Sequence, residues 1–128
     1  MQAIASREFV LWQRDEGVLV FLAGLALFWQ VDGGLAWWAA IVLFFAPDLS
    51  FAAYLLGPRF GAVIYNLVHL HAFGLLVLAA GLILAAPLAA SLGALWLAHC
   101  GLDRALGYGL KSGESFQSTH LGRIGKKA

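Results

Sequence analysis

Four imidazole and carboxylate side chains lie in stretches of sequence that are otherwise apolar. They are Asp48, His69, His99 and Asp103. His99 and Asp103 are four residues apart, so they share one face of a helix. Ionisable groups are costly in hydrocarbon, so all four are expected to turn inward and satisfy one another. Imidazoles and carboxylates that converge from different helices are the usual ligands of a divalent metal such as zinc.

Each of these residues also has a purely structural explanation. His99 and Asp103 could form a hydrogen-bonded pair that joins two helices. Asp48 follows Pro47 directly and could cap the second half of a kinked helix. His69 is the hardest to explain in this way, because an unpaired imidazole has no local use in lipid. We therefore predict a metal site and keep a hydrogen-bond network as its alternative.

Other polar residues near the same level complete the candidate site. Glu16 is the candidate general base, since it lies at the edge of an apolar stretch. Arg59, Arg104 and Asn66 are candidate substrate-binding residues: the two arginines could hold a phosphate near headgroup depth, and Asn66 shares a helix face with His69. The structural alternatives are an interhelical hydrogen bond for Asn66, an interfacial position for Glu16 and snorkelling of Arg104.

Composition indicates a membrane protein. The chain has 128 residues, of which 62% are hydrophobic and 12% are charged, against about 25% charged in a soluble domain. We predict an all-α integral membrane bundle of four transmembrane helices, forming a single domain over residues 1–128. The expected spans are about 9–30, 35–56, 60–84 and 87–110, followed by a cytoplasmic tail over 111–128.

Charge placement predicts the orientation of these spans. All eight basic residues fall on the side that holds both termini, and the two opposite loops have none. The positive-inside rule then places both termini in the cytoplasm, as in a multi-pass protein of the cell inner membrane. The basic residues are Arg7, Arg14, Arg59, Arg104, Lys111, Arg123, Lys126 and Lys127.

The depth of the four residues in the expected membrane supports a common site. Asp48, His69 and His99 each lie nine or ten residues from the cytoplasmic end of their own expected helix, and Asp103 lies one turn shallower. At 1.5 Å per residue they form one layer in the cytoplasmic half of the bundle.

Three further features carry expectations about packing. Pro47 should kink its helix, because it lacks a backbone donor. Ala23 and Ala26 in the first span, and small residues in the last, should let helix backbones approach closely. The tail from 115 to 125 contains apolar residues and should fold back, which would bring His120 to the rim of the polar layer. The small residues of the last span are Ala90, Ala94 and Ala98.

Several segments resemble a family of small bacterial and archaeal four-helix membrane proteins of unknown function. The matching blocks are "RDEG", "FFAPDLSFAAYLLGPRFGAVIYNLVH", "WLAHCGLDRALGYGLK" and "THLGRIG". This resemblance implies the four-helix fold and brings no activity with it.

A weaker resemblance is to membrane-bound metal-dependent hydrolases. Those proteins carry a "PD" motif, a His-rich helix and then "H-x3-D", and here "PDLS", "NLVH" and "HCGLD" follow in that order. The chain departs from them at Ser50, where they have a second carboxylate, and it lacks their "HRG-x-TH" block. The resemblance implies a metal-dependent hydrolase in which one ligand is missing or is supplied by Glu16.

Three functions remain open from the sequence. The first is a metal-dependent hydrolase of a lipid or lipid-linked phosphate at the cytoplasmic leaflet. The second is a non-enzymatic accessory or structural subunit of a membrane complex, or a homo-oligomer, in which the polar layer only stabilises the bundle. The third, ranked below these, is a haem or tetrapyrrole carrier with His69 or His99 as axial ligand. Because no basic run with interleaved aromatics occurs, we expect no nucleic-acid partner.

Overall fold

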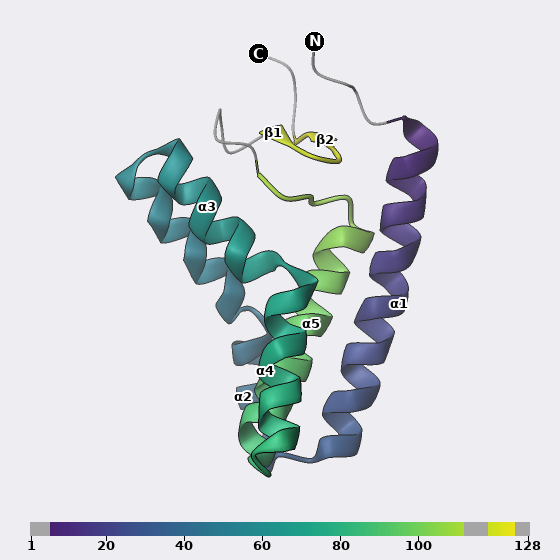
Figure 1. Cartoon of the computed structure of the whole chain (residues 1–128), viewed down its shortest axis with the longest axis vertical. Helices are drawn as coiled ribbons and strands as arrows, with labels where there is room; N and C mark the ends of the chain where they lie inside the picture. Colours follow the sequence, from purple (N-terminus) through teal and green to yellow (C-terminus); the bar gives the residue numbers. More distant parts are fainter. Residues whose placement is uncertain (1–5, 112–117, 125–128) are drawn as a thin grey trace.

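The computed structural model describes residues 6–111 and 118–124, and this part of the chain is helical apart from one short hairpin (Figure 1). The α-helices are α1 (Arg7–Val31), α2 (Trp37–Phe44), α3 (Pro58–His69), α4 (His71–Ile83) and α5 (Pro87–Ala105). A 3-10 helix, η1 (Ala46–Leu56), follows α2. The strands β1 (Ser118–Thr119) and β2 (Gly122–Arg123) pair antiparallel.

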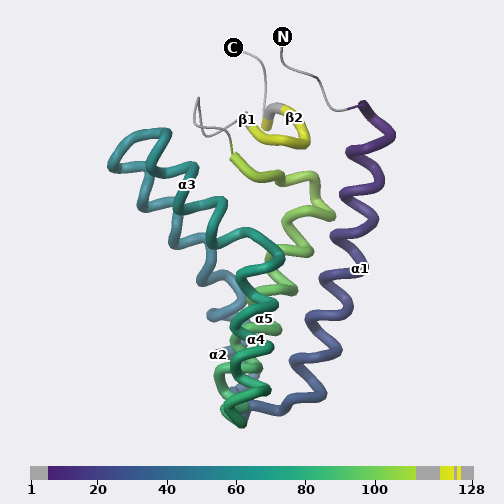
Figure 2. The backbone as a smooth tube through the Cα atoms, viewed as in Figure 1, coloured from purple at the N-terminus to yellow at the C-terminus, as the bar shows by residue number. Residues whose placement is uncertain are grey.

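The chain runs along the molecule four times, as the backbone trace in Figure 2 shows. First α1 runs from one end to the other, and α2 with η1 returns. Then α3 and α4 run away again, and α5 comes back. The start of α1 and the β1–β2 hairpin therefore lie at the same end of the molecule.

Local signals explain where α1 begins and ends. The Ser6 hydroxyl accepts a hydrogen bond from the Phe9 amide at 3.3 Å, which satisfies a free donor of the first turn. Asp32 adopts the left-handed conformation, with φ of 48°, and its amide bonds back to Phe28. The break expected before the two glycines at 33 and 34 is confirmed.

Pro47 changes the type of its helix. The α-helical pattern of α2 ends at Phe44, and η1 begins at Ala46 with Pro47 in its first turn. Because proline has no amide hydrogen to donate, the α-helical ladder cannot continue through it. The structure shows the effect of Pro47 as a change to 3-10 winding over eleven residues.

The helix expected over 60–84 is broken, which corrects the sequence prediction. Leu70 is extended, with φ of −70° and ψ of 136°, and the axes of α3 and α4 meet there at 46°. The two halves have different partners: α3 packs against η1, whereas α4 packs against α5. Neither proline nor glycine marks the break, so the sequence gives no local signal for it.

The last helix is shorter than expected, since α5 ends at Ala105 and not near residue 110. Leu106 caps it, and Gly107 takes a φ of +91° that L side chains rarely adopt. The chain then turns toward the hairpin.

Close packing against α5 depends on glycines that the sequence analysis left out. A Cβ atom on Gly24 of α1 would lie 2.7 Å from the Ala98 nitrogen, and one on Gly74 of α4 would lie 2.6 Å from the Leu97 nitrogen. The expected role of Ala90, Ala94 and Ala98 is confirmed, as all three are fully buried. Ala23 and Ala26 are exposed instead, which corrects their expected place at the interface.

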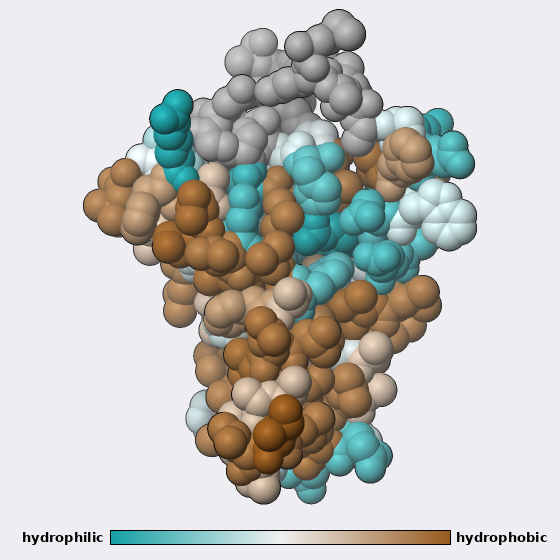
Figure 3. Space-filling view, in the orientation of Figure 1, coloured by the Kyte–Doolittle hydropathy of each residue, from teal (hydrophilic) through white to brown (hydrophobic). Residues whose placement is uncertain are grey.

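The described surface is unusually apolar. Trp37 is 76% exposed, Leu55 89% and Ile83 82%. Figure 3 shows hydrophobic residues over most of the visible face, with hydrophilic residues gathered mainly toward the end that holds the start of α1. The α2–η1 segment, Trp37–Leu56, is long and apolar enough to cross a membrane. The bent α3–α4 pair passes the same test only when its two helices are taken together.

Candidate metal centre

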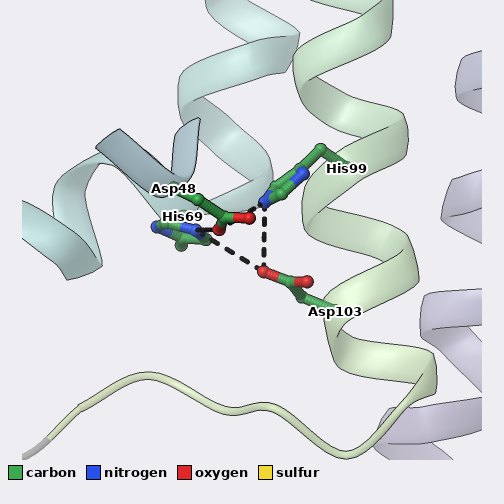
Figure 4. Close-up of side chains that lie close together, drawn as sticks. All are labelled: Asp48, His69, His99 and Asp103. Atoms are coloured by element: carbon green, nitrogen blue, oxygen red, sulfur yellow. Dashed lines mark hydrogen bonds and ion pairs between the residues drawn. The ribbon is translucent and has the colours of Figure 1, made fainter. Parts of the chain in front are cut away.

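Asp48 enters the site from the first turn of η1. Its backbone amide bonds to the Phe45 carbonyl at 3.0 Å, while its side chain does not cap η1. The Ser50 hydroxyl, which bonds to the Pro47 carbonyl at 2.8 Å, serves the turn instead. The Asp48 carboxylate points toward two histidines (Figure 4).

Asp48, His69, His99 and Asp103 converge on one point, as the sequence predicted. One ligand atom from each residue lies within 4.8 Å of the ligand atoms of the other three. The break at Leu70 places His69 at the end of α3, while α5 presents His99 and Asp103 from successive turns. Both imidazoles are buried, and Asp48 and Asp103 are 37% and 19% exposed.

The distances in this cluster match those of a tetrahedral metal site. His99 Nε2 lies 3.1 Å from Asp48 Oδ1 and 3.2 Å from Asp103 Oδ2. His69 Nε2 lies 3.4 Å and 3.5 Å from the same two oxygens. Tetrahedral ligands at ~2.0–2.1 Å from zinc lie ~3.3–3.4 Å from one another. Four of the six distances between the ligand atoms are therefore close to those of a zinc site, and all six are within 4.8 Å, so the cluster could hold a metal ion.

A hydrogen bond to the backbone sets the tautomer of neutral His69. Its Nδ1 lies 2.8 Å from the Tyr65 carbonyl oxygen, which can only accept. Neutral His69 therefore carries its proton on Nδ1, and the Nε2 lone pair faces two carboxylate oxygens. Three acceptors that face one another need a proton or a metal ion between them, and His69 Nε2 lies within hydrogen-bond distance of Asp48 Oδ1, at 3.4 Å. A ligating histidine typically has this arrangement, with its other ring nitrogen bonded to a backbone carbonyl.

His99 leads to the same conclusion by a different route. Its Nε2 is buried and close to both carboxylates, yet it has no partner in hydrogen-bond geometry among the described residues. Its contact with Asp103, 3.2 Å from Nε2 to Oδ2, fits the pair within α5 that the sequence left as an alternative, as well as a shared metal. The rings of Phe44 and Phe45 contact the His99 ring edge-on, with centroids at 5.3 Å and 6.4 Å, and hold its orientation.

Aromatic stacking also orients His69, and the sequence analysis missed it. The Tyr65 ring stacks on His69 with centroids 3.8 Å apart and 14° between the planes, and Phe51 stacks on Tyr65. Tyr65 precedes His69 by four residues, so helical spacing could have indicated this contact.

The remaining predicted site residues lie outside this group of four. Glu16 is exposed on α1, and Arg59 is exposed in the first turn of α3. Arg104 is buried, and its Nη1 lies 3.0 Å from His120 Nε2.

The Asn66 side chain binds the backbone of Lys111. Its Nδ2 donates to the Lys111 carbonyl at 2.7 Å, and its Oδ1 accepts from the Lys111 amide at 2.6 Å. Asn66 therefore holds the segment that follows α5.

A pocket of about 240 Å³ opens beside the cluster, and the sequence analysis did not foresee it. The two carboxylates form part of its wall, together with Lys111 from the segment after α5. Burial lowers the pKa of the Lys111 ammonium, while the nearby Asp103 carboxylate acts in the opposite direction. The other lining residues are Phe51, Tyr65, Tyr108 and Ile124.

The haem alternative does not fit this geometry. Both Nε2 atoms lie within 3.5 Å of the same two carboxylate oxygens, and the ring centroids are only 5.4 Å apart. The carboxylates occupy the space in which a macrocycle would have to lie between two axial imidazoles. The cluster therefore suits a single ion.

The described part of the tail folds back, as expected. Lys111 bridges to Thr119, and the Leu110 amide donates to His120 Nδ1 at 2.8 Å. His120 thus reaches Arg104 at the end of α5. Residues 115–117 and 125 of the predicted tail segment lie outside the described residues.

Acidification is expected to release this tail. Burial and the Arg104 guanidinium lower the pKa of His120, and Nδ1 must be unprotonated to accept from Leu110. Docking is then complete above the free histidine pKa of ~6.5 and is lost as the pH falls from there toward the lower docked value. The protection of the Leu110 amide against hydrogen exchange, taken relative to its intrinsic rate at each pH, should fall over this range. An equal pH-dependent fall in His120→Gln would show that another group is responsible.

The comparisons with known proteins give a family and nothing closer. The family model described as "Domain of unknown function (DUF4260)" matches residues 10–124, which is most of the chain. No curated protein and no solved structure matches. The weaker resemblance to membrane-bound metal-dependent hydrolases is therefore not supported.

Proposed function

Because the chain belongs to the family of unknown function DUF4260, we propose its role from the site itself: a membrane-embedded, metal-dependent hydrolase of lipid or lipid-linked phosphate. The observation that carries this proposal is the placement of Asp48 and Asp103. Both face the histidines, and both also line the 240 Å³ pocket. A substrate in that pocket would lie directly against the metal centre, whereas a purely structural site has no need of a pocket.

The membrane part of the proposal rests on surface and topology. The four passes of the chain place the start of α1 and the hairpin at one end. The window of the α2–η1 segment is only 6% buried, so it is not the covered core helix of a soluble domain. We propose that α1, α2 with η1, α3 with α4, and α5 form four spans. Charged residues in α1 and α5, such as Asp15 and Asp103, would lie at the ends or in the interior.

Both termini are expected in the cytoplasm, because all eight basic residues fall on that side of a four-span arrangement. Reporter fusions at the C-terminus measure this directly. A reporter that works only in the cytoplasm should be active, and one that works only outside the inner membrane should be silent. The reverse pattern would overturn the proposed orientation.

The hydrolysis would use the metal and the Asp48 carboxylate. A divalent metal in the cluster would polarise a phosphoryl oxygen and activate water. During catalysis His69, His99 and Asp103 would hold the metal and leave its fourth position to water, while Asp48, the more exposed carboxylate, would take the proton of that water. The water oxygen would bond to phosphorus, the bond between phosphorus and the ester oxygen would break, and Asp48 would pass the proton it took from water to that leaving alcohol oxygen. Glu16 is exposed on α1 and lies outside the cluster, so we assign it no part in this step.

An apolar groove supports a lipid as the substrate. It has a volume of about 310 Å³, and Phe44 and Phe45 form part of its wall while also contacting His99. An acyl chain in this groove would lie beside the metal centre. The other lining residues include Leu25, Phe28 and Leu95.

Phosphate release from lipids tests the activity. Zinc-loaded protein in phosphatidylcholine nanodiscs that contain phosphatidic acid or an isoprenoid phosphate should release phosphate, and metal-stripped protein should not. His71→Ala provides a matched histidine control, because His71 lies outside the four-residue cluster. A zinc-loaded protein that hydrolyses neither substrate would favour the accessory-subunit alternative.

A further inference from the structure

The pocket beside the metal centre contains one cation, contributed by Lys111. Among the residues that line the pocket, Asp48, Asp103 and Lys111 carry formal charge. Lys111 is only 5% exposed, and its Nζ lies 5.1 Å from the centre of the Tyr65 ring. A buried ammonium is costly to maintain unless its surroundings use its charge. The segment after α5 thus brings a positive charge to the same space as the two carboxylates.

The backbone of Lys111 is held in place from two sides. The Asn66 side chain makes two hydrogen bonds to it, of 2.7 Å and 2.6 Å. On its other side, Lys111 forms a β-bridge with Thr119 of β1. Asn66 lies on α3 three residues before His69, so one short helix positions both a cluster histidine and the pocket lysine. Because Lys111 is fixed relative to the metal centre, its ammonium is preorganised for a ligand.

The sign of the charge in the pocket depends on the metal. Two carboxylates with neutral histidines carry two negative charges, which a divalent ion would cancel. The Lys111 ammonium would then leave the pocket with one net positive charge. Without the metal, the same groups would carry one net negative charge and would repel an anion. An anion is therefore expected to bind only to the metal-loaded protein.

We propose that Lys111 and the metal centre together bind a terminal phosphate monoester, with the Lys111 ammonium on a non-bridging phosphate oxygen. This rests on the proposed function, since the metal supplies half of the positive field. The pocket is small, and Ile124 of the tail forms part of its wall, so a terminal group fits better than a diester that must continue on both sides. Asn66 acts as a positioning residue and does not contact the phosphate.

Inorganic phosphate is the probe that tests this proposal. Wild-type protein in phosphatidylcholine nanodiscs, zinc-loaded or metal-stripped, would be titrated with phosphate by calorimetry. The zinc-loaded protein should bind phosphate and the stripped protein should not. Lys111→Gln should weaken binding about 10- to 100-fold, as expected for a lost charge-assisted hydrogen bond, while Lys111→Arg should largely retain it. Arg7→Gln is the matched control, because Arg7 is an exposed cation that does not line the pocket.

The zinc content of every variant is also measured. It distinguishes failure of the proposed role of Lys111 from failure of the proposed metal-dependent function. Lys111→Gln that keeps zinc and binds phosphate as tightly as wild type would overturn the role of Lys111 and leave the metal centre intact. Wild-type protein that takes up no zinc would overturn the proposed function itself. Nanodiscs that contain phosphatidic acid distinguish the source of the ligand. Competition with added phosphate would indicate a lipid headgroup, and its absence a soluble phosphate ester.

Discussion

Replacing His99 with alanine is expected to abolish tight metal binding in a protein that still inserts into the membrane. His99 Nε2 lies 3.1 Å and 3.2 Å from the two cluster carboxylates, so its loss would leave three ligands and an open edge. Loss of an outer-shell partner alone typically costs ~10- to 100-fold in metal affinity, and loss of a direct ligand should exceed this. The measurement is competition for zinc against a chelator of known affinity.

His71→Ala is the control for this experiment, because it removes an imidazole from the next helix without touching the cluster. It should bind zinc as wild type does. His69→Ala should behave like His99→Ala, since its Nε2 faces the same two carboxylates. If all three alanine variants hold zinc equally well, the four-residue cluster is a hydrogen-bond network and not a metal centre.

Replacing Gly24 with valine is expected to cause a large loss of stability. Even a Cβ atom there would lie 2.7 Å from the backbone nitrogen of Ala98, so α1 would have to move away from α5. Overpacking of this kind typically costs ~1–3 kcal/mol and occasionally more. Thermal unfolding in detergent should show a clear fall in the midpoint for Gly24→Val.

Ala23→Val offers a control one residue away on the same helix. Ala23 is exposed, so its larger side chain would meet solvent or lipid and leave the midpoint nearly unchanged. Equal destabilisation by the two substitutions would show that α1 does not pack on α5 through Gly24.

The candidate cluster could be predicted from the sequence because two quantities that can be read from it were enough. These are the spacing of residues along one helix and the depth of each residue along its own helix. His99 and Asp103 are four residues apart on one helix, which fixes their common face. Counting along the expected helices placed Asp48 and His69 at nearly the same depth. Since a hydrocarbon environment drives ionisable groups inward, common depth was enough to predict that the four converge.

Features set by tertiary packing could not be predicted in this way. The break at Leu70 reflects the separate partners of α3 and α4, and no residue there signals it. Glycine was treated only as a breaker of helices, so the close contact at Gly24 was assigned to Ala23 instead. Asn66, 45 residues earlier in the sequence, holds the backbone of Lys111 beside the pocket. Such a long-range pairing leaves no pattern in one sequence.

X-ray absorption spectroscopy of the zinc-loaded wild-type protein tests the central claim most directly. The account predicts four nitrogen or oxygen neighbours at ~2.0–2.1 Å, with the outer-shell scattering of two imidazoles. This is the ligand set of Asp48, His69, His99 and Asp103. A sulfur neighbour at ~2.3 Å would instead implicate Cys100, the single cysteine of the chain. Either that result or a shell of oxygens without imidazole scattering would contradict the metal centre described above.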